Sequence, residues 1–139
     1  MKTQRLILTL LALTFALAPH SLTTASTARP REYSAKMISP KPGDVLMPGQ
    51  VVRVEWTANF PDVDVTMCET EVLLSLDGGA TIFMMITSER NPKVQHFNWT
   101  VPNAPTQMAV LDIRFGCMAL YPETSSLQVQ STFAIGSID

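Results

Sequence analysis

The chain has 139 residues, of which 46% are hydrophobic and 16% charged, and its formal net charge is −2. This length suffices for one domain with a single hydrophobic core, but not for two such domains. A mildly acidic chain without a basic cluster lacks the Lys and Arg that nucleic-acid phosphates and anionic membrane surfaces require, so the composition argues against both of these partners.

The N-terminal segment has the layout of a secretory signal peptide. Lys2 and Arg5 form a positively charged start, and an uncharged apolar run follows over 6–18. This run is shorter than the roughly 20 apolar residues that span a membrane. Small residues then allow cleavage after Ala28, which we favour, or after Ala25. We therefore predict a secreted or periplasmic protein with no membrane insertion after signal removal.

Removal of the signal peptide, residues 1–28, leaves eight Lys and Arg against twelve Asp and Glu, a net charge of −4. We assign residues 29–36 to a polar leader and 37–137 to the domain. The two cysteines, Cys68 and Cys117, are an even number in an exported chain, which favours a disulfide. Closing a loop of this length stabilises a fold by about 4 kcal/mol on the chain-entropy model.

The mature chain shows no helical periodicity. Its apolar residues alternate in short runs separated by Pro, Gly and Asp, a pattern that predicts β-strands. The predicted strands are 36–39, 45–47, 51–56, 71–76, 81–87, 94–101, 108–115 and 127–135, of which 45–47 is a brief edge piece. About seven strands in such a chain predict an all-β fold, an immunoglobulin- or fibronectin-III-like β-sandwich.

Alternation within the strands also predicts which side chains face the core. The expected inward residues of three strands are Val52, Val54 and Trp56; Val72, Leu74 and Leu76; and Leu111, Ile113 and Phe115. Asp112 and Arg114 are expected to point outward. Between two strands, Asp77-Gly78-Gly79 predicts a tight turn, because glycine supplies the positive φ angles that hairpins need. Within the Ser75-x-Asp77-x-Gly79-x-Thr81 pattern, Asp77 is expected to cap that turn.

Five ordered motifs carry a family resemblance. They read ISPKPGDVLMPGQVVRVEW, VLLSLDGGAT, FNWTVPN, LDIRF and TFAI, and together they extend over residues 38–135. This order resembles the immunoglobulin-like module of secreted bacterial proteins, and the related N-terminal module of fungal proteins implicated in cell-wall β-glucan assembly. The resemblance implies the sandwich fold and a non-catalytic role. The chain departs from the pattern in its acidic connection, 57–69, and in its cysteine pair.

No catalytic or cofactor-binding constellation is recognisable. His96 is the only histidine left after signal removal, and by alternation it faces solvent. Nucleophilic catalysis needs a hydroxyl or thiol next to a positioned base, and an isolated histidine offers weak grounds for one. Asp62, Asp64 and Glu69 are close enough in sequence to suggest oxygen ligands for calcium, although such spacing is also common in solvated loops. We therefore expect no enzyme, no metal and no cofactor.

A Cys68–Cys117 disulfide is expected to join two long loops, 57–69 and 117–124, at one end of the sandwich. Loops held on a rigid scaffold commonly carry binding sites. The candidate partner-binding residues are the apolar members of the two loops: Phe60, Val63, Met67, Met118, Leu120 and Tyr121. Packing of these same side chains over the open end of the sandwich is an equal alternative.

Two functional hypotheses follow from this organisation. The first is a non-catalytic extracytoplasmic binding or structural module that contacts a protein or a cell-wall polysaccharide through the two loops. The alternative is a periplasmic copper-handling protein that uses Met67, Cys68, Cys117 and Met118, because soft thiolate and thioether ligands suit Cu(I). The copper hypothesis requires reduced cysteines.

Overall fold

The computed structural model describes residues 32–89, 91–126 and 132–138. The predicted signal peptide, both of its cleavage sites and the start of the leader lie outside these ranges. The described residues form an all-β structure without an α-helix: β1 (Ser34–Ser39), β2 (Val45–Leu46), β3 (Val51–Asn59), the 3₁₀ turn η1 (Val65–Met67), β4 (Cys68–Ser75), β5 (Met84–Glu89), β6 (His96–Thr100), β7 (Thr106–Cys117), β8 (Tyr121–Thr124) and β9 (Phe133–Ile135). Over the same ranges, no helix is long and apolar enough to cross a membrane.

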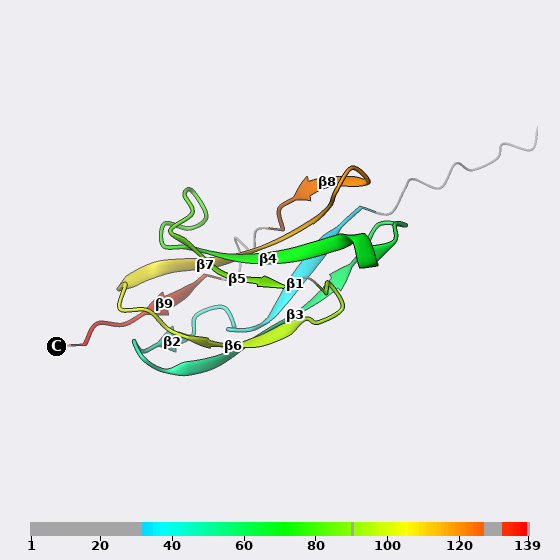
Figure 1. Ribbon diagram of the computed structural model, residues 1–139. Coiled ribbons are helices and arrows are strands. Elements are labelled where there is room, and N and C mark those ends of the chain that lie inside the picture. Colours follow the sequence, from blue (N-terminus) through cyan, green and yellow to red (C-terminus); the bar gives the residue numbers. More distant parts are fainter. Residues whose placement is uncertain (1–31, 90, 127–131, 139) are drawn as a thin grey trace, which may run out of the picture.

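The strands form two sheets that lie in layers (Figure 1). The three-stranded sheet has the order β1-β3-β6, and the six-stranded sheet has the order β2-β9-β7-β4-β5 with β8 added beside β7. The long strand β7 pairs with β4 along one edge. Along its other edge it pairs first with β9 and then with β8. The arrangement is sandwich-like, as the strand pattern predicted.

The main core lies between the two layers. Its buried side chains come from both sheets and include Val54, Trp56, Val72, Leu74, Trp99, Leu111, Ile113, Phe133 and Ile135. In the β4–β7 ladder the inward pairs are Val72 with Ile113 and Leu74 with Leu111. The predicted inward faces of these strands are therefore confirmed, because strict alternation places every second residue on one side of a sheet.

A second, aromatic cluster closes one end of the sandwich. The rings of Tyr33, Phe60 and Phe115 all contact one another: Phe60 and Phe115 have ring centroids 6.1 and 5.0 Å from that of Tyr33 and 5.1 Å from each other. Its hydroxyl donates a hydrogen bond of 3.1 Å to the carbonyl of Ile113. Tyr33 is only 6% exposed and β1 begins at Ser34. The end of the predicted leader thus belongs to the fold, because Tyr33 is buried in this cluster and β1 includes residues 34–36.

Several strand limits differ from those predicted. The return strand after the turn starts later, at Met84, and the predicted loop over 117–124 contains β8. Asp112 lies on the outward face of β7 as expected, yet it is 1% exposed. It is covered by Arg114 and Ser125, which both bond its carboxylate. Residues 127–131 of the predicted last strand lie outside the described ranges.

The hairpin that follows β4 is organised by Asp77. One carboxylate oxygen accepts hydrogen bonds from the Ser75 hydroxyl at 2.7 Å and the Thr81 amide at 2.9 Å, and the other accepts from the Thr81 hydroxyl at 2.6 Å. Gly78 and Gly79 have φ angles of 73° and 93°, which suit glycine. The Asp77 carboxylate therefore stabilises the turn by hydrogen bonds to residues on both sides of it.

Candidate binding groove at the disulfide end

The predicted disulfide between Cys68 and Cys117 is present. Cys68 begins β4 and Cys117 ends β7, and the two residues lie directly opposite each other in the same sheet. Both side chains point inward, into the aromatic cluster. The bridge therefore fixes the chain segment that enters β4 and the segment that leaves β7 at one corner of the molecule.

An open groove of about 790 Å³ lies at this corner. Its base is the outward face of the six-stranded sheet, where Glu71 of β4 is paired with Arg114 of β7. On one side stands the segment around Met67, and on the other stands the turn that leads into β8. The lining residues are Thr66, Met67, Cys68, Glu69, Glu71, Arg114, Gly116, Cys117, Met118, Ala119, Leu120, Tyr121, Pro122 and Glu123.

The six predicted contact residues divide into two groups. Met67, Met118 and Leu120 line the groove and are 59%, 85% and 56% exposed. Phe60 and Val63 instead pack against the aromatic cluster. These two residues follow the capping alternative, in which packing against the cluster removes apolar surface from water.

Tyr121 belongs to both the groove and the cluster. It lines the groove, while its ring lies 5.7 Å from that of Phe115. Its hydroxyl accepts a hydrogen bond of 3.1 Å from the backbone N–H of Tyr33. Because one side of its ring packs against the aromatic cluster, Tyr121 forms an apolar wall of the groove in a fixed position.

Gly116 lets β8 come close to β7, a feature that the sequence analysis missed. A Cβ atom at this position would lie 3.1 Å from the Cα of Glu123. The β7–β8 register shifts between Phe115 and Cys117, which is where Glu123 crosses Gly116. A glycine inside a strand commonly marks a bulge or a close backbone approach, and this was the available signal.

One guanidinium organises the polar side of the groove. Arg114 Nε donates to Oδ2 of Asp112 and its NH1 donates to Oε1 of Glu123, both at 2.8 Å. These two hydrogen bonds raise the pKa of Arg114, Asp112 first and Glu123 second. The positive charge is thus already matched by a buried carboxylate and by one groove carboxylate.

Glu71 lies in the base of the groove in an unfavourable electrostatic setting. Partial burial raises the pKa of its carboxyl, and the neighbouring Glu123 and Glu69 raise it further, whereas Arg114 acts in the opposite direction. Among the described residues, neither Glu69 nor Glu71 forms an ion pair. The groove is therefore negatively charged at its base.

The other candidate residues do not converge on a site. Asp64 caps η1, where its Oδ1 accepts from the amide and the hydroxyl of Thr66, and these bonds lower its pKa. Over the described ranges, no group of three or more His, Cys, Asp or Glu side chains is placed to hold a metal ion. His96 is exposed on β6.

Comparison with known proteins adds no relative: no protein-family model matches the chain, and no curated protein shows significant similarity to it.

Proposed function

We propose that the chain is a non-catalytic, extracytoplasmic immunoglobulin-like module that binds a protein partner in the groove at its disulfide end. The observation that carries the proposal is the exposure of Met67, Met118 and Leu120 around a concave surface. Methionine, tyrosine and arginine are enriched in protein–protein interfaces, and all three types line this groove. Flexible methionines also adapt to irregular partner surfaces.

The strand order supports the immunoglobulin-like part of this proposal. In such a sandwich, β1, β3 and β6 would take the places of strands A, B and E. The strands β4, β5, β7 and β9 would take the places of C, C′, F and G in the opposite sheet. The disulfide then joins C to F within one sheet, whereas antibody domains join B to F across the sandwich.

A protein partner is favoured over a polysaccharide by the placement of the aromatic rings. Sugar-binding surfaces commonly offer exposed rings against which a sugar face stacks. Here Trp56 and Trp99 are buried in the core, Tyr33 is buried in the aromatic cluster, and Tyr121 is held against Phe115. Apart from the partly buried ring of Tyr121, the apolar groups of the described residues that line the groove are aliphatic and thioether chains, which suit apolar side chains of a protein.

The copper alternative is weakened by the disulfide. Cys68 and Cys117 are joined to each other and cannot act as thiolate ligands in this state. The two thioethers of Met67 and Met118 are then the remaining soft ligands of the proposed set. No observation favours this alternative over binding of a protein.

The test is a selection of displayed random peptides against the oxidised mature chain, followed by affinity measurements on the selected peptides. The double variant Met118→Ser/Leu120→Ser should bind them at least tenfold more weakly, because apolar contact area is lost from the groove. The matched control is Met84→Ser/Met85→Ser, which alters two exposed methionines on β5. This control should bind as the unmodified chain does.

Two results would contradict the proposal. One is an equal loss of affinity in the groove variant and in the β5 control, which would place binding elsewhere or make it nonspecific. The other is retention of the chain by insoluble β-glucan or peptidoglycan that the groove substitutions abolish, which would make the partner a polysaccharide.

A further inference from the structure

We propose that the protein segment that binds in the groove is positively charged, with Lys or Arg side chains beside apolar ones. This inference rests on the proposed function, and it names the chemistry of the partner. The observation behind it is the arrangement of charged and apolar side chains in the groove: the carboxylates come from strands of the sheet, whereas the exposed methionine and leucine side chains come from the segments that flank those strands.

The carboxylates occupy the base and one wall. Glu69 and Glu71 extend from the outward face of β4, and Glu123 comes from β8. Arg114 is the only cationic residue among the described residues that line the groove. Because Arg114 also bonds the buried Asp112, its charge does not neutralise the three glutamates. The groove therefore has an uncompensated negative charge that a cationic partner would complement.

The apolar side chains stand around these carboxylates. Met67 precedes the start of β4, and Met118 and Leu120 lie on the turn between β7 and β8. A ligand in the groove would therefore contact both apolar surface and carboxylates. A Lys or Arg suits this arrangement, since its aliphatic stem can lie against methionine while its charged end reaches the glutamates.

The state of Glu71 agrees with this partner. Burial and the neighbouring Glu123 and Glu69 keep its pKa above the usual range. A cation in the groove would relieve that repulsion and bring the pKa down, so that binding and deprotonation of Glu71 favour each other. Affinity for a cationic segment should therefore fall as the pH is lowered through the pKa of Glu71, and it should fall with added salt.

The experiment uses synthetic peptides that share their apolar positions and carry Lys, Ser or Glu at the others. Their affinities for the oxidised mature chain are measured by fluorescence anisotropy. The Lys peptide should bind most tightly, and Glu71→Gln should weaken its binding roughly tenfold by removing one charge-assisted contact. Glu55→Gln, which removes an exposed carboxylate from β3 on the other sheet, is the control and should leave the affinity unchanged.

Glu71→Gln is a suitable variant because it removes a charge that its surroundings disfavour, so the fold should tolerate it. Binding of all three peptides with similar affinity, reduced by Met118→Ser but not by Glu71→Gln, would overturn the cationic partner and leave the proposed function in place. Binding of the Lys peptide that responds to Glu71→Gln but not to Met118→Ser would contradict the apolar part of both proposals. The absence of binding by any peptide would count against the proposed function itself.

A further variant separates an external partner from Arg29 and Arg31, the chain's own arginines that precede Tyr33 in the sequence. If Arg29→Ser/Arg31→Ser leaves the affinity for the Lys peptide unchanged, the external partner is supported. If this variant binds the Lys peptide at least tenfold more tightly than the unmodified chain does, the chain's own arginines compete for the groove, and the external partner is overturned.

Discussion

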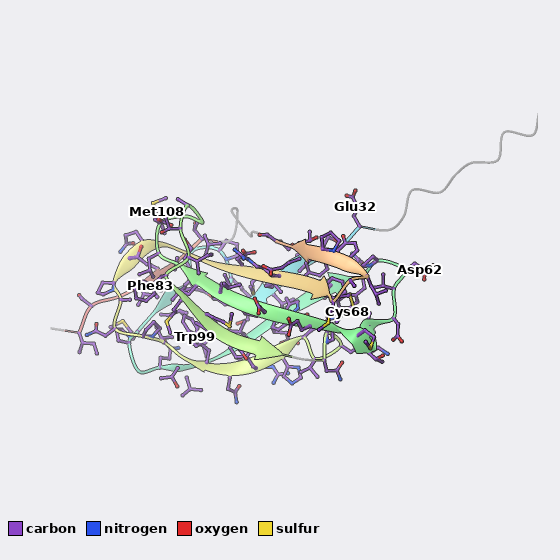
Figure 2. All side chains as sticks on the ribbon, turned by 45° about the horizontal axis from the view of Figure 1, so that its top comes forward. Glu32, Asp62, Cys68, Phe83, Trp99 and Met108 are labelled. Carbon is purple, nitrogen blue, oxygen red and sulfur yellow. A yellow bond between two sulfur atoms is a disulfide. The ribbon has the colours of Figure 1, made fainter. Side chains whose placement is uncertain are left out.

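The two ends of the sandwich both expose methionines, but they are stabilised by different means. At the disulfide end, a covalent bond and stacked aromatic rings lie beneath the groove. At the hairpin end, the hydrogen bonds of Asp77 hold the turn, and Phe83 and Met108 are exposed near it. Figure 2 shows Phe83 and Met108 at the opposite end from Cys68 and Asp62.

The two ends differ in whether charged side chains lie next to the exposed apolar ones. Residues 82–87 of the hairpin end contain no charged side chain, and β5 is the last strand in its sheet. The β4–β5 register shifts between Val72 and Leu73, where Ile86 is the extra residue on β5. Bulges of this kind twist an edge strand and discourage pairing with another chain. At the disulfide end the apolar side chains instead surround charged groups in a concave surface, as expected of a specific site.

The largest expected effect comes from breaking the covalent bond at the groove end. Reduction of the disulfide, or the double variant Cys68→Ala/Cys117→Ala, should lower the free energy of unfolding by about 4 kcal/mol, because a long loop in the unfolded chain is released. Denaturant unfolding followed by the fluorescence of Trp56 and Trp99, which lie in the main core, measures the change. Hydrogen exchange should then increase more at β8 than in the hairpin. An unchanged unfolding midpoint after verified reduction would show that the bridge contributes little.

Much of this fold could be predicted from alternation alone. The inward faces of β4 and β7 were predicted correctly because each has apolar residues at every second position, and the disulfide followed from an even cysteine count in a chain predicted to be exported. These features depend on local sequence and on composition. They need no knowledge of which segments pack against one another.

The parts that were missed depend on contacts between distant segments. Tyr33 looks like part of a polar leader until Phe60 and Phe115 are placed against it. Asp112 looks solvent-exposed until Ser125 returns to cover it. In the same way, nothing in a list of loop residues separates Phe60, which packs inward, from Met118, which does not.

The next largest effect is expected from a substitution that disturbs the close approach of β8 to β7 at the groove. Gly116→Ala would place a Cβ atom 3.1 Å from the Cα of Glu123, and backbone atoms yield less readily than a side-chain end. We expect a loss of about 1–3 kcal/mol in stability, as for other overpacked sites, together with weaker peptide binding. The control is Gly136→Ala, whose nearest neighbour is the flexible end of Met47. If both variants change stability and peptide affinity equally, the close approach of β8 to Gly116 does not determine the shape of the groove.

The smallest effect belongs to the hairpin end, where the hydrogen bonds of Asp77 are exposed to competing water. Bonds from Thr81 and Ser75 lower the pKa of Asp77 from 3.8 to about 2. Since the folded-state pKa lies below the unfolded value, this contribution to stability is fully present above pH 3.8 and is lost as the pH falls from there toward about 2. The variant Asp77→Asn removes the titrating group, so its stability should decline less steeply than that of the unmodified chain across this interval.

Thermal unfolding of both chains over the acidic range measures that difference, and the other carboxyl groups cancel in the comparison. The groove end should respond in the opposite sense, because the raised pKa of Glu71 means that its protonation favours the folded state. The unmodified chain should therefore lose stability as the pH rises through the pKa of Glu71, and the Glu71→Gln variant should not show this loss. Parallel pH profiles for both variants would mean that the two ends are not electrostatically distinct. Opposite slopes would support the view that one end uses its carboxylate for the fold while the other keeps its carboxylates available for a ligand.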